Sequence, residues 1–423
     1  MDLNLKKMWP AAATSLVAIT SLLSAADDMQ MRNMENRLTA LEQRKGANGM
    51  INPSARPGVR DGSDVFVTAA ALYWKPNESG LEYAIDGTDG GNTTYAKEGS
   101  VLNSRSKYSW GFKVGLGYNM PHDGWDLYLN WTHFTSKKGW DCCEEGCEEE
   151  CGECGPCVPT PVNPCPSIIF PVAADFATPF IPPGYYACDA FSKWKLRLNI
   201  LDLEMGRDFF VSKYLSLRPN FGLRGVKINQ TQAIQYNGIL TTEGPQLMKP
   251  LTIGTMNIEN HIKNGAKFWG VGPRAGVNTL WSFGSGWGLY GDAAISLLYG
   301  RMNTLHNEYL EFGVPTSPCE CEEECECECV LQTPVQDLEG NGGRCKKQYL
   351  TRAATDLALG IAWDHQFRDD RFHLGFALGW EHHMFFGMNQ FMRFHDVFEQ
   401  GSMSANNGDL ATQGWTLSGR FDF

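Results

Sequence analysis

The sequence predicts an all-β fold, namely a transmembrane antiparallel β-barrel of about 10–16 strands preceded by a short helix. In the last run of the chain, Trp415, Leu417 and Phe421 alternate with polar residues, and the run closes on Phe423. A soluble sandwich strand also alternates, but a strand that closes on an aromatic residue is typical of outer-membrane barrels. No segment after residue 26 holds the ~20 apolar residues that a spanning helix needs. A membrane protein with this profile must satisfy its backbone polar groups in a closed barrel.

Residues 1–26 are typical of a secretory signal peptide. Lys6 and Lys7 precede an apolar run over residues 8–23, and small residues at 24–26 offer a cleavage site. A permanent N-terminal anchor helix is the alternative, but the apolar run is short and acidic residues follow it. We therefore expect an exported protein of the outer membrane in a Gram-negative envelope.

The segment between the signal peptide and the barrel is expected to contain a helix and a linker. Residues 27–45 place methionines and leucines at 3–4–3 spacing among charged residues, which predicts a short heptad-like helix in the periplasm. The alternative is a lone amphipathic helix that lies on the barrel rim. Residues 46–63 are rich in glycine, proline, asparagine and serine, which predicts a linker. The barrel is expected over residues 64–423.

The expected barrel strands are runs in which apolar and polar residues alternate with the two-residue period of a strand. Aromatic residues often stand near both ends of a run, as in the girdles of membrane barrels. Most runs reach roughly the 9–11 residues that a tilted spanning strand requires. The ten runs are residues 65–74, 109–119, 125–134, 194–207, 214–228, 267–281, 287–300, 349–363, 372–384 and 410–423.

The connections between these runs are alternately short and long. Bacterial barrels have short periplasmic turns and long outer loops, so both chain ends are expected in the periplasm. Further hairpins would fit within residues 75–108 and 229–266, so the expected strand number extends to about sixteen. Two of the long outer loops, residues 135–193 and 301–348, are rich in cysteine.

One run departs from simple alternation. Within residues 194–207, the apolar residues change from even to odd positions between Ile200 and Leu201. A β-bulge is the simplest explanation, because the extra residue of a bulge disturbs the side-chain alternation. The alternative is that Asp202 and Glu204 face inward and the apolar pattern is imperfect.

All fourteen cysteines lie in the two cysteine-rich loops. An exported chain meets an oxidising compartment, so disulfides are expected, although their connectivity cannot be read from the sequence. A soft metal at residues 319–329 and redox chemistry at residues 154–157 are weaker alternatives, because zinc sites usually pair CxxC elements and thioredoxin-type motifs need a helix N-terminus. We expect neither a metal site nor a cofactor. The disulfide candidates are Cys142, Cys143, Cys147, Cys151, Cys154, Cys157, Cys165, Cys188, Cys319, Cys321, Cys325, Cys327, Cys329 and Cys345.

Inward strand positions carry charged residues of both signs. A wide barrel is wet inside, so such residues are tolerated there, and rings of charge across a constriction select ions and hydrophilic solutes. We expect a lumen narrowed by these charges and by an infolded outer loop. The alternative is that the charges pair as struts of the wall, with no role in selectivity. The expected pore-lining residues are Lys113, Asp126, Lys195, Arg197, Arg218, Arg224, Arg274, Asp292, Arg352, Asp356, Glu381 and Arg420.

Several segments resemble one known family. Residues 201–207, 268–276 and 288–301, with the opening at 64–69 and the ending at 408–423, are similar to the Legionella-type pore-forming outer-membrane protein family. That family is similar in character to the chlamydial major outer membrane protein. The resemblance implies a β-barrel porin in the outer membrane, with disulfide cross-linking of the envelope.

The expected function is passive diffusion of small hydrophilic solutes and ions through an outer-membrane porin. One alternative is a structural or adhesive surface protein, in which the barrel is an anchor and the cysteine-rich loops cross-link the envelope. Another is a soluble all-β secreted protein. Expected partners are outer-membrane lipid, small hydrophilic solutes and ions, and envelope proteins or further copies of the chain linked by disulfides.

Other function classes are disfavoured. The net charge of −12 argues against nucleic acid, which requires a basic surface. No G-x-S-x-G motif occurs, so we expect no enzyme. His382 and His383 are neighbours in a strand and point to opposite faces, so they are not expected to share a metal.

Overall fold

The computed structural model describes residues 54–59, 62–87, 99–121, 124–137, 168–171, 187–240, 256–313, 344–368, 371–394 and 403–423. The predicted signal peptide, the heptad-like helix and most of the cysteines lie outside these residues. Among the described residues, no helix is long and apolar enough to cross a membrane.

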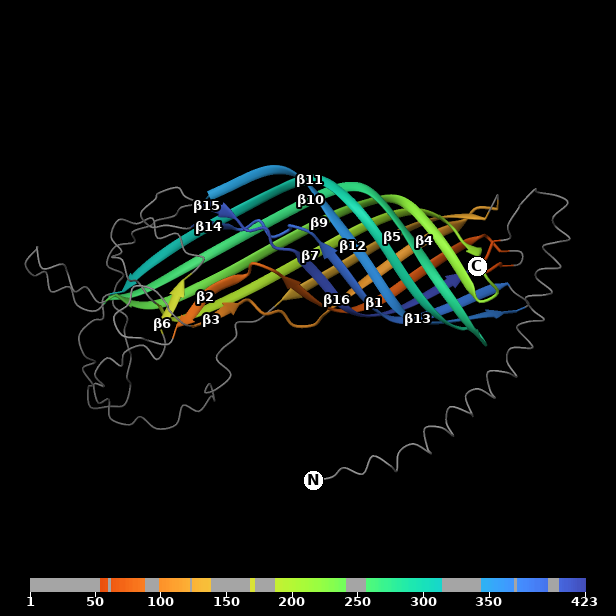
Figure 1. Ribbon diagram of the computed structural model, residues 1–423, viewed down its shortest axis with the longest axis horizontal. Coiled ribbons are helices and arrows are strands. Elements are labelled where there is room, and N and C mark those ends of the chain that lie inside the picture. Colours follow the sequence, from red (N-terminus) through yellow and green to blue (C-terminus); the bar gives the residue numbers. More distant parts are fainter. Residues whose placement is uncertain are drawn as a thin grey trace, which may run out of the picture.

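Ten antiparallel strands form a closed barrel (Figure 1). The wall closes because β1 pairs with β4 on one side and with β16 on the other. Each of the ten predicted runs falls on one of these strands, so the barrel is confirmed at the lower end of the expected strand number. In order around the wall, the strands are β1 (Val65–Glu78), β4 (Ser109–Asn119), β5 (Trp125–Lys137), β7 (Ala187–Arg207), β9 (Leu215–Leu240), β10 (Met256–Gly284), β11 (Trp287–Gly313), β12 (Arg344–Phe367), β13 (Phe372–Phe385) and β16 (Leu410–Asp422).

Six short strands complete the described fold. They are β2 (Glu82–Gly87), β3 (Gly99–Asn103), β6 (Ile168–Pro171), β8 (Phe209–Phe210), β14 (Met392–Phe394) and β15 (Met403–Ala405). All except β8 lie at the end of the barrel opposite the C-terminus (Figure 1). The hairpin of β2 and β3 occupies part of the predicted long loop 75–108 but adds no strand to the wall. Residues 229–266 contain no hairpin of their own in the described part and instead lengthen β9 and β10.

The strand register fixes the tilt of the barrel. Following hydrogen-bonded partners from Phe66 around all ten strands returns to β1 at Glu78, twelve residues farther along. A stagger of this size in a ten-stranded wall tilts the strands by about 40° from the barrel axis, within the usual range for barrels. Ten strands enclose an interior only slightly wider than that of eight-stranded barrels, which side chains can fill.

One end of the barrel, here called the turn end, carries the short connections. The tightest of them joins β10 to β11 through Ser285 and Gly286, whose φ angles are 54° and 81°. Positive φ at both central residues is the geometry of a type I′ turn, which matches the twist of the flanking strands. The opposite end, here called the loop end, carries the long connections.

The outer face has a hydrophobic band bounded by aromatic residues. On β10, Trp269 and Trp281 both point outward, are 55% and 53% exposed, and are twelve residues apart. At ~3.3 Å per residue and a tilt of about 40°, they lie about 30 Å apart along the barrel axis, which is the thickness of a bilayer core. Outward aromatic residues toward the loop end include Tyr73, Trp110, Trp131, Trp269, Tyr299 and Tyr349, and those toward the turn end include Tyr118, Trp281, Phe283, Trp287, Phe421 and Phe423.

Beyond the loop-end aromatic residues, the polarity of the wall is reversed. On β7, Trp194, Leu196 and Leu198 are buried inside the barrel, whereas Lys195 and Arg197 lie on the outer face. The prediction that Lys195 and Arg197 line the lumen is therefore wrong. The prediction fails because β7 extends past the hydrophobic band. In this part of the strand the outer face of β7 meets water, while its inner face packs in an apolar core.

The predicted β-bulge in β7 is also wrong. The register of β7 with β5 runs without a break across Ile200 and Leu201. Ile200 is buried with the apolar core, Leu201 is 50% exposed on the outer face, and Asp202 and Glu204 are buried inside. The even positions from 190 to 206 therefore face inward, and the type of residue changes because the surroundings change.

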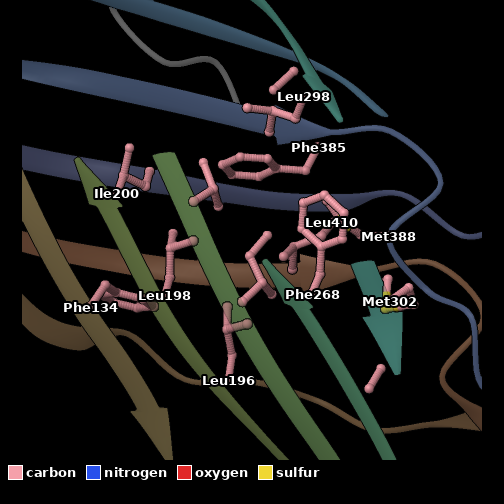
Figure 2. Packing of buried hydrophobic residues seen from close by; sticks show 14 of the residues in the cluster. Phe134, Leu196, Leu198, Ile200, Phe268, Leu298, Met302, Phe385, Met388 and Leu410 are labelled. Carbon is pink, nitrogen blue, oxygen red and sulfur yellow. The ribbon is translucent and has the colours of Figure 1, made fainter. Parts of the chain in front are cut away.

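The interior is divided into layers along the barrel axis. A polar layer lies toward the turn end and is described below. Above it, an apolar core fills the barrel with side chains from β1, β5, β7, β9, β10, β11, β12, β13 and β16 (Figure 2). Its fully buried members include Leu72, Trp74, Phe134, Leu196, Leu198, Phe268, Leu298, Phe385, Met388 and Leu410. A smaller apolar cluster nearer the loop end joins Ala84, Ile234, Tyr236 and Ile262.

Candidate functional site: the barrel interior

The polar layer is organised around Arg224 on β9. Its Nε and Nη2 donate to the two carboxylate oxygens of Asp202 on β7, at 2.6 and 2.8 Å. Its Nη1 lies 2.7 Å from Asp356 Oδ2 on β12. The Arg224 side chain is only 3% exposed, so the two carboxylates compensate a guanidinium that has lost nearly all of its water.

A chain of contacts leads from Asp356 to the opposite wall. Asp356 Oδ1 lies 2.8 Å from His383 Nδ1, and His383 Nε2 lies 3.1 Å from Glu381 Oε2, both on β13. Glu381 accepts a hydrogen bond of 2.5 Å from Lys113 Nζ on β4. The Lys113 ammonium also stands 5.1 Å above the ring of Trp74. Ion pairs therefore cross the interior between strands that are not neighbours in the wall.

A second branch continues from Arg274 on β10. Arg274 contacts Glu204 and also donates to Asp356 at 3.2 Å. Arg218 on β9 makes a two-pronged contact with Asp126, with Nε and Nη2 at 2.8 and 2.5 Å from its oxygens. Arg218 Nη1 lies 3.6 Å from Glu204 Oε2, which links the two arginines through one acid.

Asparagines extend this branch. Asn278 on β10 accepts from Arg218 Nη1 and from Asn220 Nδ2, each at 2.8 Å. Its own Nδ2 donates to Asp292 Oδ1 on β11 at 2.8 Å. Amide and carboxylate groups thus form a hydrogen-bonded network across three adjacent strands, of the kind that makes a buried polar layer rigid.

A further cluster of charged residues lies at the turn end of the interior. Arg420 on β16 donates to Asp422 at 2.7 Å and covers the ring of Phe66 at 3.9 Å. His373 Nδ1 lies 2.8 Å from Asp422 Oδ2. In the turn between β7 and β8, burial raises the pKa of Asp208 to about 6, although Arg218 and Arg420 oppose the rise.

The infolded segment, Phe386–Phe394, lies against the loop end of the apolar core. Met388 is fully buried and Phe391 is 3% exposed, and both belong to that core (Figure 2 shows Met388). Asn389 fixes the segment by donating to the carbonyls of Ser79 and Gly80, at 2.9 and 3.0 Å. The segment therefore packs apolar side chains over the top of the polar layer.

Arg352 is placed beside this segment rather than in the ion-pair network. Gly387, at φ 62°, leaves room for it, because a Cβ there would lie 2.9 Å from the Arg352 guanidinium. The Gly387 N–H donates to Asp409 Oδ1 at 2.7 Å. Arg352 and Asp409 thus flank the start of the infolded segment.

Ten of the twelve predicted pore-lining residues face the interior, and Lys195 and Arg197 are the exceptions. The structure brings Lys113, Arg218, Arg224 and Arg274 into contact with the acids at 126, 356 and 381. The predicted pore-lining set omitted Asp202, Glu204 and His383. For the two acids, inward positions were expected only as the alternative to a β-bulge, and that alternative is confirmed. The signal that could have found the two acids was the unbroken even spacing of β7.

The side chains at the centre of the polar layer are almost closed to solvent. Arg224 is 2%, Asp202 4% and Asp356 7% exposed. Chemically, the layer offers fixed positive and negative groups within a few ångströms of one another, with an apolar core above. Among the described residues, no group of three or more His, Cys, Asp or Glu side chains could hold a metal ion.

The chain is similar to solved structures only at low sequence identity. No curated protein matches the chain. Structural similarity extends to the outer membrane protease OmpT from Escherichia coli (9% identity, 87% of this chain and 99% of that chain, TM-score 0.34). It also extends to a Pseudomonas aeruginosa FadL homologue (9% identity, 86% and 91%, TM-score 0.27) and the toluene transporter TodX of Pseudomonas putida (9% identity, 88% and 93%, TM-score 0.23). These similarities are too low to support an inference about this chain.

The family comparison is decisive. The model of the family described as Legionella pneumophila major outer membrane protein precursor matches residues 57–423. The match includes all ten strands of the wall. The chain therefore belongs to the Legionella major outer membrane protein family and is an outer-membrane β-barrel protein.

Proposed function

We propose that the protein is a narrow, gated channel for small ions and small hydrophilic solutes. The observation that carries the proposal is the layer of charged residues across the interior, centred on Arg224 and Asp356. A barrel that served only as an anchor could fill its interior with apolar side chains, which is often as stable as buried ion pairs. Charges of both signs in a lumen are how pores select ions.

The size of the barrel limits what can pass. Aqueous channels of general porins have 16–18 strands, whereas barrels near eight strands are filled by side chains. The ten-stranded wall is close to the second case, so free passage of large sugars is not expected. Passage requires rearrangement of the ion pairs and of the infolded segment, whose Met388 and Phe391 form a hydrophobic constriction of the kind that gates by excluding water.

A second candidate is a structural surface protein anchored by the barrel. The nearly complete burial of the polar layer favours it, because Arg224 and Asp202 are as inaccessible as core residues. In that case the ion pairs act as struts between strands. The predicted disulfide cross-linking of the envelope belongs to this candidate and concerns residues that are mostly outside the described part.

Planar-bilayer recording tests the proposal. Wild type is expected to give current steps, and Arg274→Gln is expected to shift the reversal potential in a KCl gradient toward potassium selectivity, because Glu204 loses a positive partner. Arg301→Gln is the matched control, since Arg301 lies on the outer face of β11 beside Trp269 and Tyr349.

Absence of current steps from wild type and from Arg274→Gln would contradict the channel and favour the anchor. That conclusion requires folded protein, which heat-modifiable migration on a detergent gel establishes. An equal shift in Arg301→Gln would show that the interior charge has no special role.

A further inference from the structure

The outer face carries a collar of positive charge just beyond the hydrophobic band toward the loop end. The cationic collar consists of Lys195, Arg197, Lys227, Lys263, Lys267, Arg301 and Lys347. All seven occupy outward positions of β7, β9, β10, β11 and β12, which are consecutive strands of the wall. Arg197, Lys227, Lys263, Lys267 and Lys347 are exposed, and Lys195 and Arg301 are half-buried.

The strand register places collar residues of neighbouring strands in one row across the outer face. Arg197 pairs with Asn229, which pairs with Lys267, which pairs with Asn303, which pairs with Lys347. This row alternates cations with amides across five strands, so both side-chain types offer hydrogen-bond donors to the same outer surface. No carboxylate interrupts the row.

A second row shows where the collar meets the hydrophobic band. Lys227 pairs with Trp269, Trp269 pairs with Arg301, and Arg301 pairs with Tyr349. Trp269 is 55% and Tyr349 64% exposed on the outer face. Cations and interfacial aromatic residues therefore alternate along the boundary between lipid and water, where long basic side chains reach toward headgroups.

The charge of the collar contrasts with that of the chain, whose net charge is −12. On β7 and β10, outward carboxylates begin only at Asp189 and Glu259, which lie farther from the band than the collar. Within the described part of the chain, none of the seven collar cations makes an ion pair with a carboxylate. The collar is therefore available to an anionic partner from outside the chain.

We propose that the cationic collar binds the phosphate groups of a phosphorylated glycolipid in the outer leaflet, such as lipid A. The surface matches an amphiphile whose phosphates face the collar while its acyl chains lie against Leu201, Val271 and Leu297 directly beneath, each at least half exposed. A soluble anionic protein would match the charge but not the adjoining hydrophobic band. The proposal is independent of whether the barrel conducts.

Binding of bisphosphoryl lipid A to the full-length protein in detergent tests this surface. The variant Arg197→Gln/Lys267→Gln/Lys347→Gln removes three collar charges. Since one basic side chain at an anionic membrane surface contributes about 1 kcal/mol, the affinity is expected to fall by up to about 100-fold. The control, Lys213→Gln/Arg368→Gln/Arg371→Gln, removes three exposed cations from the turn end, on the far side of the hydrophobic band, and should leave the affinity within about twofold.

Wild type supplies a second test that needs no variant. Dephosphorylated lipid A should bind at least about tenfold more weakly than the bisphosphoryl form, because each phosphate carries the charge that the collar recognises. Equal binding of the two lipids, or equal loss in the two triple variants, would overturn the proposal. Displacement of lipid A by inorganic phosphate beyond that caused by chloride at equal ionic strength would also overturn it, since the site would then recognise free phosphate.

Discussion

Replacing Met388 and Phe391 with serine is expected to raise the conductance of the barrel by roughly tenfold or more, because a hydrophobic constriction that excludes water also excludes ions. Met388 is fully buried and Phe391 is 3% exposed in the apolar core. Serine at both positions removes the two side chains that the infolded segment contributes to the apolar core and admits water above the polar layer. Single-channel recording in planar bilayers measures the change.

The control for this prediction is Phe386→Ser in the same segment. Phe386 is 38% exposed and lies outside the apolar core, so its replacement should leave the conductance near that of wild type. Two results would contradict the gate. One is an unchanged conductance in the folded Met388→Ser/Phe391→Ser variant, and the other is an equal increase in Phe386→Ser.

Arg224→Met is expected to lower the free energy of unfolding by about 3–5 kcal/mol, because it leaves two carboxylates buried without their shared counter-ion. Arg224 bonds both oxygens of Asp202 and also contacts Asp356 at 2.7 Å, with its side chain 3% exposed. Urea unfolding of the barrel in lipid vesicles, followed by tryptophan fluorescence, gives the change.

Arg197→Met is the control for this prediction, and its free energy of unfolding is measured in the same way. Arg197 is exposed on the outer face of β7, so its loss should change the free energy of unfolding by less than about 0.5 kcal/mol. If the two variants were equally stable, Arg224 would not be the centre of the polar layer. A stability loss confined to Arg224→Met supports the network whether or not the barrel conducts.

The strands of the wall could be predicted because lipid and lumen impose a two-residue period on every spanning strand. Trp269 and Trp281, for example, mark the two boundaries of the band on β10 in the sequence itself. The tight turn at Ser285 and Gly286 could also be anticipated, since short connections alternate with long ones along the chain.

The direction of side chains beyond the band could not be predicted from the same rule. The rule that apolar residues point outward holds only where a strand crosses the lipid. On β7, Trp194 and Leu196 lie beyond the lipid and face inward. Lys195 and Arg197 then face water rather than the lumen. The sequence of one strand does not show where the membrane ends, because that depends on the register with its neighbours.

The partners of the charged side chains inside the barrel could not be predicted from the sequence either. Lys113 and Glu381 are 268 residues apart and meet only because the wall closes. His383 joins Asp356 and Glu381 for the same reason, although strand alternation alone predicted only that it faces away from His382. Inward charge could be expected from spacing, whereas its partners depend on curvature and stagger.

The most direct measurement is the set of nuclear Overhauser effects between lipid acyl-chain protons and methyl groups of the protein in nanodiscs. Two pairs of sequence neighbours, Ile200 with Leu201 and Leu297 with Leu298, provide the test. Leu201 and Leu297 are 50% and 53% exposed on the outer face, while Ile200 and Leu298 are 3% and 0% exposed inside the barrel. We expect acyl-chain contacts for Leu201 and Leu297 and none for Ile200 and Leu298. Contacts to Ile200 or Leu298, or their absence from Leu201 and Leu297, would contradict a lipid-facing wall around a filled interior.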